Sequence, residues 1–209
     1  MAKILIIDDE ETIRFAFEDF LKKEGHSVFS ACSYEEALAV IAEVDLDLIF
    51  SDILLEGKGG MEILREVKER NMLCPVIMIT GYPNVESASE AVRLGAFDYI
   101  SKPLRRDALL HSTKLGLQHK ALLEEKEAYR QNLDAVFRSV KDAIITVDSN
   151  RKILALNDAA ADICSITADA VGKTLDSLPL SCRKTCLHAV GETIKSGKVV
   201  EIYRMECGR

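Results

Sequence analysis

The chain has 209 residues, of which 48% are hydrophobic and 29% charged, and its formal net charge is −7. This length and apolar content can bury the core of one large or two modest domains, and we expect two. The acidic balance excludes a nucleic-acid-binding surface on this fragment, because neutralising phosphates needs clustered lysine and arginine. The opening MAKILIIDDE has no room for a signal-peptide core and no apolar run approaches membrane-spanning length, so we expect a cytoplasmic protein without membrane contact.

The first hundred residues alternate short apolar runs with amphipathic stretches. Four of the five runs are continuously apolar, which is typical of strands buried on both faces of a sheet. The stretches between them repeat apolar residues at three- and four-residue spacing, which predicts helices, and two of these stop at a glycine. The alternation predicts an α/β fold with a five-stranded, doubly wound parallel sheet. The expected strands are 3–7, 27–32, 47–50, 75–80 and 97–101, and the expected helices are 10–25, 34–44, 60–71 and 84–95.

Polar side chains follow four of these strands at the carboxyl edge of the sheet, where such folds place their chemistry. Taken singly, each could cap a helix or start a turn. Taken together, crowded carboxylates repel and need a cation, which a hard divalent metal such as Mg²⁺ supplies. The simplest chemistry is phosphoryl transfer onto one carboxylate, with the metal and a lysine offsetting the charge on the transferred oxygens. The residues concerned are Asp8, Asp9, Ser51, Asp52, Thr80 and Lys102.

Residues 1–118 resemble a response-regulator receiver domain. The pair DD and the segments DLIFSDILLEGKGGMEIL, VIMITGY and AFDYISKPL occur in the family's order and at its spacing. The resemblance implies a flavodoxin-like fold in which Asp52 accepts a phosphoryl group from a sensor histidine kinase. It also implies that Asp9, Asp52 and the backbone carbonyl of Leu54 bind Mg²⁺ directly, with Asp8 acting through water.

The same resemblance assigns the residues that respond to the phosphoryl group. Thr80 would bind it, Lys102 would form an ion pair with it, and the rotamer of Tyr99 would follow it. In the family the peptide bond between this lysine and the next residue is cis, and Pro103 permits that isomer at modest cost.

The loop after the acceptor departs from the family pattern. Members commonly carry Met-Pro at the third and fourth positions after the acceptor, where this chain has Leu55 and Glu56. We therefore expect a more mobile loop with an added negative charge. Leu54 and Tyr82 flank the path along which water would attack the aspartyl phosphate, and we expect both to slow its hydrolysis.

Residues 104–140 contain no proline and carry charges of both signs, which predicts one long exposed helix. The fifth receiver helix would continue through a linker at 119–133. Apolar residues recur at seven-residue intervals, although the matching d-type positions are polar. We expect this helix and the receiver to pair two copies of the chain; the alternative is a solvated connector. The apolar positions are Leu115, Leu122, Tyr129 and Val136.

Residues 134–209 form the second expected unit. AIITVD and KILALN predict a hairpin with SNR as its turn, and the segment resembles the first half of a PAS domain, an α+β fold with an antiparallel sheet. Asn157 is expected to cap the helix leading to Ala161. A helix at 185–197 and a strand at 199–207 follow. Because the PAS sheet needs further strands, we expect a fragment, with an output domain beyond Arg209.

Some PAS pockets hold haem, flavin or small ligands, so the ligand of this unit is unknown. His188 is the candidate axial ligand for haem, and Cys182 with Cys186 is a candidate metal pair that lacks a second pair. We expect neither haem nor a metal at these residues, and favour a PAS unit that only contacts other proteins. His111 and His119 are expected on the surface.

These resemblances imply a phosphorylation-controlled regulator similar to nitrogen-regulation-type transcription regulators. Hybrid histidine kinases and cyclic-dinucleotide enzymes share the arrangement and remain alternatives. A different class, the Mg²⁺-dependent aspartyl-phosphate phosphatases, needs an acid two residues after the nucleophile, where this chain has Leu54. We therefore expect only self-phosphorylation and self-dephosphorylation, and no turnover of outside substrates.

Overall fold

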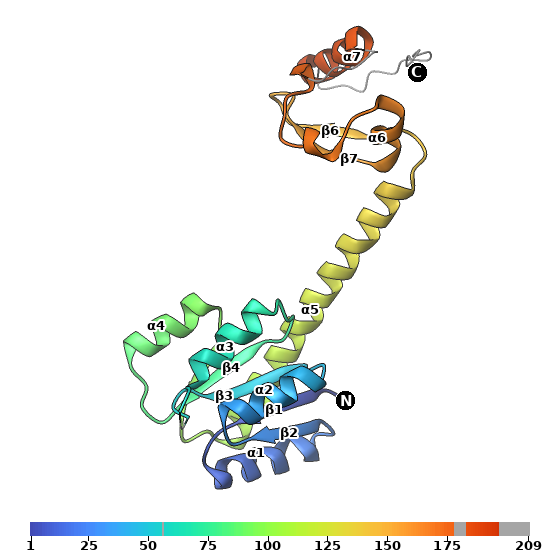
Figure 1. The fold of residues 1–209 in the computed structure, drawn as a ribbon. Coiled ribbons are helices and arrows are strands. Elements are labelled where there is room, and N and C mark those ends of the chain that lie inside the picture. The colour runs from blue at the N-terminus through green and yellow to red at the C-terminus, as the bar shows by residue number, and fades with distance from the viewer. Residues whose placement is uncertain (56, 178–182, 197–209) are drawn as a thin grey trace. The chain divides into compact units, whose positions relative to one another are not determined.

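The computed structural model describes residues 1–55, 57–177 and 183–196. The chain divides into two compact units, Met1–Glu127 and Ala128–Arg209 (Figure 1). Among the described residues, no helix combines the length and apolarity needed to cross a bilayer.

The first unit is built on a five-stranded parallel sheet with the order β2-β1-β3-β4-β5, so the predicted doubly wound fold is confirmed. Helices cover both faces of the sheet (Figure 1). One apolar cluster packs α2, α3 and α4 on the sheet, and the other packs α1 and α5 (Arg106–Ser139) on the opposite face. The strands are β1 Lys3–Ile7, β2 Ser27–Ala31, β3 Leu48–Asp52, β4 Val76–Thr80 and β5 Asp98–Ser101, and the first four helices are α1 Glu11–Lys23, α2 Tyr34–Glu43, α3 Gly60–Glu69 and α4 Val85–Leu94.

Three strands, rather than the expected four, are buried along nearly their whole length. These are β1, β3 and β4, the central strands of the sheet. The strands β2 and β5 are only partly buried, because each forms an edge with one hydrogen-bonded neighbour. An apolar run in the sequence indicates a strand but does not locate it within the sheet.

The helix α5 runs from Arg106 to Ser139, which confirms the long helix predicted over residues 104–140. Its first turns lie close to the sheet: a Cβ atom at Gly116 would stand 2.6 Å from Leu48 Cδ1. Farther along, the buried Lys120 side chain donates hydrogen bonds to the Leu46 carbonyl at 3.0 Å and to Asp47 Oδ1 at 2.7 Å. The seven-residue series of apolar side chains is exposed on this helix: Leu115, Leu122, Tyr129 and Val136.

The second unit contains the predicted hairpin, formed by β6 Ile145–Val147 and β7 Ile153–Leu156 in antiparallel pairing. Its turn places Arg151 at φ 60°. The helices α6 Asp158–Cys164 and α7 Arg183–Ser196 follow, with the short 3-10 turns η1 Ala168–Ala170 and η2 Leu175–Ser177 between them. The expected strand at 199–207 lies outside the described residues. Among the described residues of this unit, Ile153, Ile166, Ala170 and Leu175 form one buried apolar cluster, and Ala160 on α6 is buried as well.

Asn157, which directly precedes α6, is fully buried. Its Oδ1 accepts from the Ala160 amide at 2.9 Å, which confirms the predicted helix cap, and also from the Ile144 amide at 2.9 Å. Its Nδ2 donates to the carbonyls of Val140 at 3.1 Å and Asp142 at 2.9 Å. One side chain therefore connects the segment that follows α5 with the hairpin and with α6.

Candidate functional site

The carboxyl edge of the first sheet gathers two buried carboxylates around one ammonium group. Lys102 Nζ lies 2.6 Å from Asp52 Oδ2, 2.8 Å from Asp8 Oδ2 and 3.0 Å from Glu10 Oε1. The Asp8 side chain is 1% exposed and the Lys102 side chain 12% exposed. These contacts link residues that are far apart in the sequence, so the cluster exists only in the folded chain.

The strand register explains why these side chains meet. Ile7 pairs with Ser51 in the parallel β1–β3 ladder, so the next residues, Asp8 and Asp52, lie side by side at the strand ends. On the other side, the Lys102 amide donates to the Thr80 carbonyl at 2.7 Å, which fixes the end of β5 beside the end of β4. The peptide bond between Lys102 and Pro103 is cis.

The cluster contains three carboxylates and one ammonium group, and this imbalance shifts its proton equilibria. Burial alone would lower the pKa of Lys102, but hydrogen bonds to Asp52, Asp8 and Glu10 raise it well above its usual value. Burial raises the pKa of Asp8 above its usual value, although Lys102 opposes this shift. Asp8 Oδ2 accepts no well-oriented hydrogen bond, so we treat its contact with the ammonium group as an ion pair.

The carboxylates of Asp8, Glu10 and Asp52 could hold a divalent cation. Each offers an oxygen, and the three oxygens lie within 4.8 Å of one another. Hard cations such as Mg²⁺ prefer oxygen ligands, so the donor set fits. Glu10 is absent from the sequence-based set, although it directly follows the acidic pair. Asp9 is exposed and outside this group, and its backbone carbonyl accepts a hydrogen bond from Arg14 at 2.9 Å.

Local structure holds the Asp52 carboxylate in place. Its Oδ1 accepts from the Leu54 amide at 3.1 Å, while Oδ2 faces Lys102. Helix α3 begins against this strand end, and a Cβ at Gly60 would lie 2.0 Å from the Asp52 carbonyl oxygen. Only glycine allows that approach without displacing the backbone. The sequence pattern did not reveal this requirement.

Four further residues are assigned roles around the phosphoryl group, and the structure buries two of them at least partly and exposes the other two. Thr80 is 1% exposed, and its Oγ1 accepts from the Tyr82 amide at 3.1 Å. Tyr99 is half-buried, and its hydroxyl lies 2.8 Å from Ser87 Oγ on α4. The side chains of Leu54 and Tyr82 are exposed, at 56% and 78%. The roles expected for these two in phosphate lifetime remain predictions.

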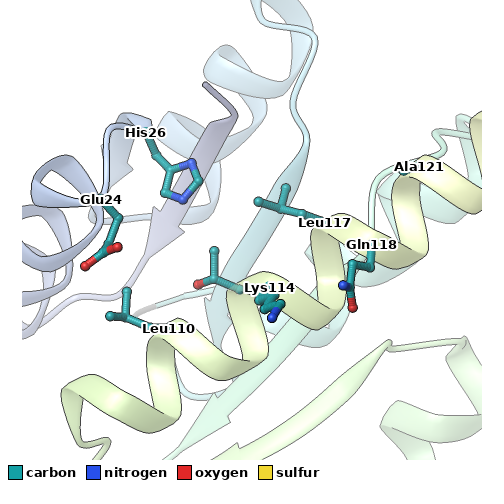
Figure 2. Close-up of a pocket in the computed structure, with 8 residues that line it drawn as sticks. Glu24, His26, Leu110, Lys114, Leu117, Gln118 and Ala121 are labelled. Atoms are coloured by element: carbon teal, nitrogen blue, oxygen red, sulfur yellow. The ribbon is translucent and has the colours of Figure 1, made fainter.

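A cavity of about 530 Å³ lies away from this rim, between α5 and the segment joining α1 to β2 (Figure 2). Glu24 and His26 line one side, and Leu110, Lys114 and Leu117 line the other (Figure 2). Burial lowers the pKa of His26, whose Nδ1 has no hydrogen-bond partner. None of the residues that line this cavity belongs to the acidic cluster around Lys102.

The candidate haem and metal ligands of the second unit form no comparable cluster among the described residues. His188 is exposed and borders a cavity of about 340 Å³ with a largely polar lining that includes Ser149, Arg151 and Lys195. The side chains of Cys182 and Cys186 lie outside what the structure describes.

The chain matches two family models and resembles several named proteins. Residues 4–114 match the model described as response regulator receiver domain, and residues 131–195 match a PAS domain model. It is 38% identical over 133 residues to a putative response regulator NtrX-like of Rickettsia bellii, covering 63% of this chain and 27% of that protein. It is 31% identical over 166 residues to the regulatory protein AtoC of Escherichia coli, covering 79% of this chain and 34% of that protein. The chain thus spans about a third or less of the length of these relatives.

Solved structures show the same fold in the first unit. A receiver domain protein from Methanospirillum hungatei superimposes with a TM-score of 0.56 at 32% identity, covering 61% of this chain and 98% of that one. The NtrX structure from Brucella abortus in complex with ATP gives a TM-score of 0.57 at 38% identity, covering 60% of this chain and 29% of that one.

Proposed function

Because this chain belongs to the response regulator receiver family of two-component signalling, we propose that Asp52 is its phosphoryl acceptor. The observation that carries this proposal is the contact of 2.6 Å between Asp52 Oδ2 and Lys102 Nζ at a buried strand end, beside a second carboxylate. A carboxylate oxygen of Asp52 would attack the phosphorus of a phosphohistidine on a sensor kinase. The phosphorus–nitrogen bond would break, and its electron pair would leave with the imidazole.

We propose that Mg²⁺ binds at this edge through Asp8 and Asp52, with Glu10 as the third nearby carboxylate. When bound, the cation would offset the charge on the transferred oxygens. The direct contact expected for Asp9 would require its exposed side chain to turn toward the cluster. Lys102 would pair with the phosphoryl oxygens, and Thr80, which is buried at the neighbouring strand end, would bind them through its hydroxyl.

We further propose that Tyr99 changes its contacts when Thr80 engages the phosphoryl group, and that this change reaches α5. The exposed apolar series on α5 would then pair two copies of the chain through receiver and linker. The receiver, residues 1–118, would act through linker 119–133 on the PAS unit and on an output domain. A transcriptional output is supported by the relatives' names, which include a nitrogen assimilation regulatory protein NtrX. A cytoplasmic location follows from that role.

Turnover of outside phosphate esters is a poorer interpretation of the site. A phosphatase of the aspartyl-phosphate class needs an acid two residues after the nucleophile to protonate the leaving group. That position is Leu54, whose side chain is aliphatic and exposed. We therefore propose that the chemistry is confined to phosphorylation and dephosphorylation of Asp52 itself.

The acceptor assignment is tested with acetyl phosphate and Mg²⁺. We expect intact-mass measurement to show one added phosphoryl group on the wild type, and peptide mapping to place it at Asp52. Asp52→Asn should lose the modification, because the amide is not a nucleophile of this kind. Asp45→Asn, at an exposed aspartate, is the matched control and should behave as wild type. Modification of the Asp52 variant to the same stoichiometry would contradict the proposal.

The pairing surface is tested by placing charges in the apolar series. Leu122→Asp combined with Tyr129→Asp should reduce the mass measured by light scattering to that of one chain, because charges in a buried seam are costly. The control is Ala121→Asp combined with Ala128→Asp, which puts the same charge on the adjacent stripe, where pairing helices tolerate it. Equal masses for wild type and both variants would show that the seven-residue spacing is accidental.

A further inference from the structure

The hydroxyl of Ser87, in the first turn of α4, contacts both Tyr99 on β5 and Asn84, the residue that caps α4. Its oxygen lies 2.8 Å from the Tyr99 hydroxyl and 3.3 Å from the Asn84 carbonyl. The carbonyl can only accept, so Ser87 donates to it, and the single hydroxyl proton of Ser87 is then used. With that proton on the Asn84 carbonyl, Tyr99 is the donor to Ser87. The direction of both hydrogen bonds follows from this count.

Asn84 also caps the helix that carries Ser87. Its Oδ1 accepts from the Ser87 amide at 2.7 Å. The backbone and the side chain of Ser87 are thus both bonded to Asn84, so Ser87 cannot move without the beginning of α4. A tyrosine that donates to Ser87 is held by the same turn of helix.

The other end of this segment is bonded to Thr80. Thr80 Oγ1 accepts from the Tyr82 amide at 3.1 Å, and Asn84 follows two residues later. Thr80 and Tyr99 lie on the adjacent strands β4 and β5, where Met78 pairs with Tyr99. Both are therefore bonded to the short segment between residues 82 and 87, Thr80 at its start and Tyr99 at its end.

We propose that Ser87 is a positioning residue that holds Tyr99 in the conformation of the unphosphorylated protein. The inference rests on the proposed function, because it concerns the response to phosphorylation of Asp52. When Thr80 moves to bind the phosphoryl group, it pulls on the amide of Tyr82 and displaces the cap of α4. The Tyr99–Ser87 hydrogen bond is lost in that step. Ser87 therefore helps to determine the equilibrium between the conformations of the unphosphorylated and the phosphorylated receiver.

The proposal predicts that removing the Ser87 hydroxyl makes a phosphoryl mimic bind more tightly. A ligand that selects a minor conformation gains apparent affinity in proportion to the population of that conformation. Loss of one hydrogen bond from the competing state should tighten binding by about twofold to tenfold. The probe is beryllofluoride with Mg²⁺, titrated into the whole 209-residue chain and followed by NMR.

A set of variants separates positioning from a general loss of stability. Ser87→Ala should bind the mimic more tightly than the wild type, and Ser87→Thr, which keeps a hydroxyl, should restore wild-type affinity. Adding Ser87→Ala to Tyr99→Phe should change nothing further, because the bond is already absent. Ser89→Ala, at an exposed serine on the same helix, is the matched control and should match the wild type.

The outcomes distinguish this inference from the proposal on which it rests. If the wild type fails to bind beryllofluoride with Mg²⁺, or if Asp52→Asn binds it equally well, the proposed function is overturned and the inference with it. If the wild type binds and Asp52→Asn does not, while Ser87→Ala has the same affinity as Ser89→Ala, only the positioning role of Ser87 is overturned. Weaker binding by Ser87→Ala, with a lowered melting temperature, would overturn it too and indicate a purely structural hydroxyl.

Discussion

The two units of this chain are stabilised by different means. In the first unit, three central strands are buried between two apolar clusters, one on each face of the sheet. In the second unit, the described residues include five buried apolar ones, and the fully buried Asn157 makes four side-chain hydrogen bonds. Apolar burial is spread over many side chains, whereas the hydrogen bonds of one asparagine depend on one residue. We therefore expect the second unit to be far more sensitive to a single substitution.

Several buried polar groups of the first unit lie outside its apolar core. Asp8, Asp52 and Thr80 lie at the rim of the sheet, where the proposed chemistry takes place, while the other buried polar groups include Lys120 on α5. The core beneath them is apolar, so changes at the rim are supported by a scaffold that does not depend on them. In the second unit the buried polar group lies within the scaffold itself.

The largest expected effect comes from removing the central asparagine. Asn157→Ala would leave the amides of Ile144 and Ala160 and two carbonyls without their partner, at a cost of about 3 kcal/mol or more. Hydrogen exchange read by mass spectrometry should lose protection across residues 140–161 and keep it in β1, β3 and β4. Asn150→Ala, at an exposed turn, is the control. Loss of protection in the central strands as well would show that the two units do not unfold independently.

A smaller effect is expected at Lys120, a buried lysine on α5. Lys120→Met would remove an ion pair with Asp47 and should cost about 2 kcal/mol of unfolding free energy, measured in urea. Burial opposes ionisation of Asp47, but hydrogen bonds from Lys120 and the Lys3 amide lower its pKa below the usual value. Burial also opposes the charge on Lys120, but its bond to Asp47 raises its pKa.

These shifts fix the pH window of that contribution. A lowered aspartate pKa stabilises the fold above the unfolded value of about 3.9, and a raised lysine pKa stabilises it below about 10.4. The difference between wild type and Lys120→Met should be constant between these limits. It should shrink as the pH falls through the lowered pKa of Asp47. Lys114→Met, at an exposed lysine on the same helix, should show no such difference. A gap that stays unchanged down to pH 2 would rule out the ion pair as its cause.

The smallest effects come from one substitution made in both units, with opposite signs. Gly116→Ala would put a methyl group 2.6 Å from the Cδ1 atom of the buried Leu48, so overpacking should outweigh the helix propensity gained and destabilise by about 1 kcal/mol. Gly191→Ala, in α7, meets no atom within 4 Å and should stabilise by up to about 1 kcal/mol. Thermal unfolding of both variants measures the difference. Stability changes of the same sign in both variants would mean that close packing does not distinguish the two helices.

The sequence predicted what depends on local periodicity. Apolar runs and helical spacing predicted every strand and helix of the receiver, and the strand ends predicted that Asp8, Asp52 and Lys102 meet at one edge of the sheet. The sequence could not place β5 at an edge, because strand order depends on contacts between distant segments. Nor could it find the contacts of Glu10 or the hydrogen bond between Ser87 and Tyr99, which join residues by geometry rather than by spacing. For Asn157, the sequence predicted the cap of α6 but not the hydrogen bonds to the carbonyls of Val140 and Asp142.

The saturation of Asn157 determines how the end of α5 can behave. An asparagine side chain has two amide hydrogens and one oxygen that readily accepts two hydrogen bonds, and here all four positions are taken. A hinge needs backbone that can rotate without breaking bonds, and the carbonyls of Val140 and Asp142 have no such freedom. The segment between α5 and β6 is therefore bonded to the same side chain that caps α6. A rotation of the last turn of α5 would have to move Asn157, and with it the start of α6, or break these hydrogen bonds.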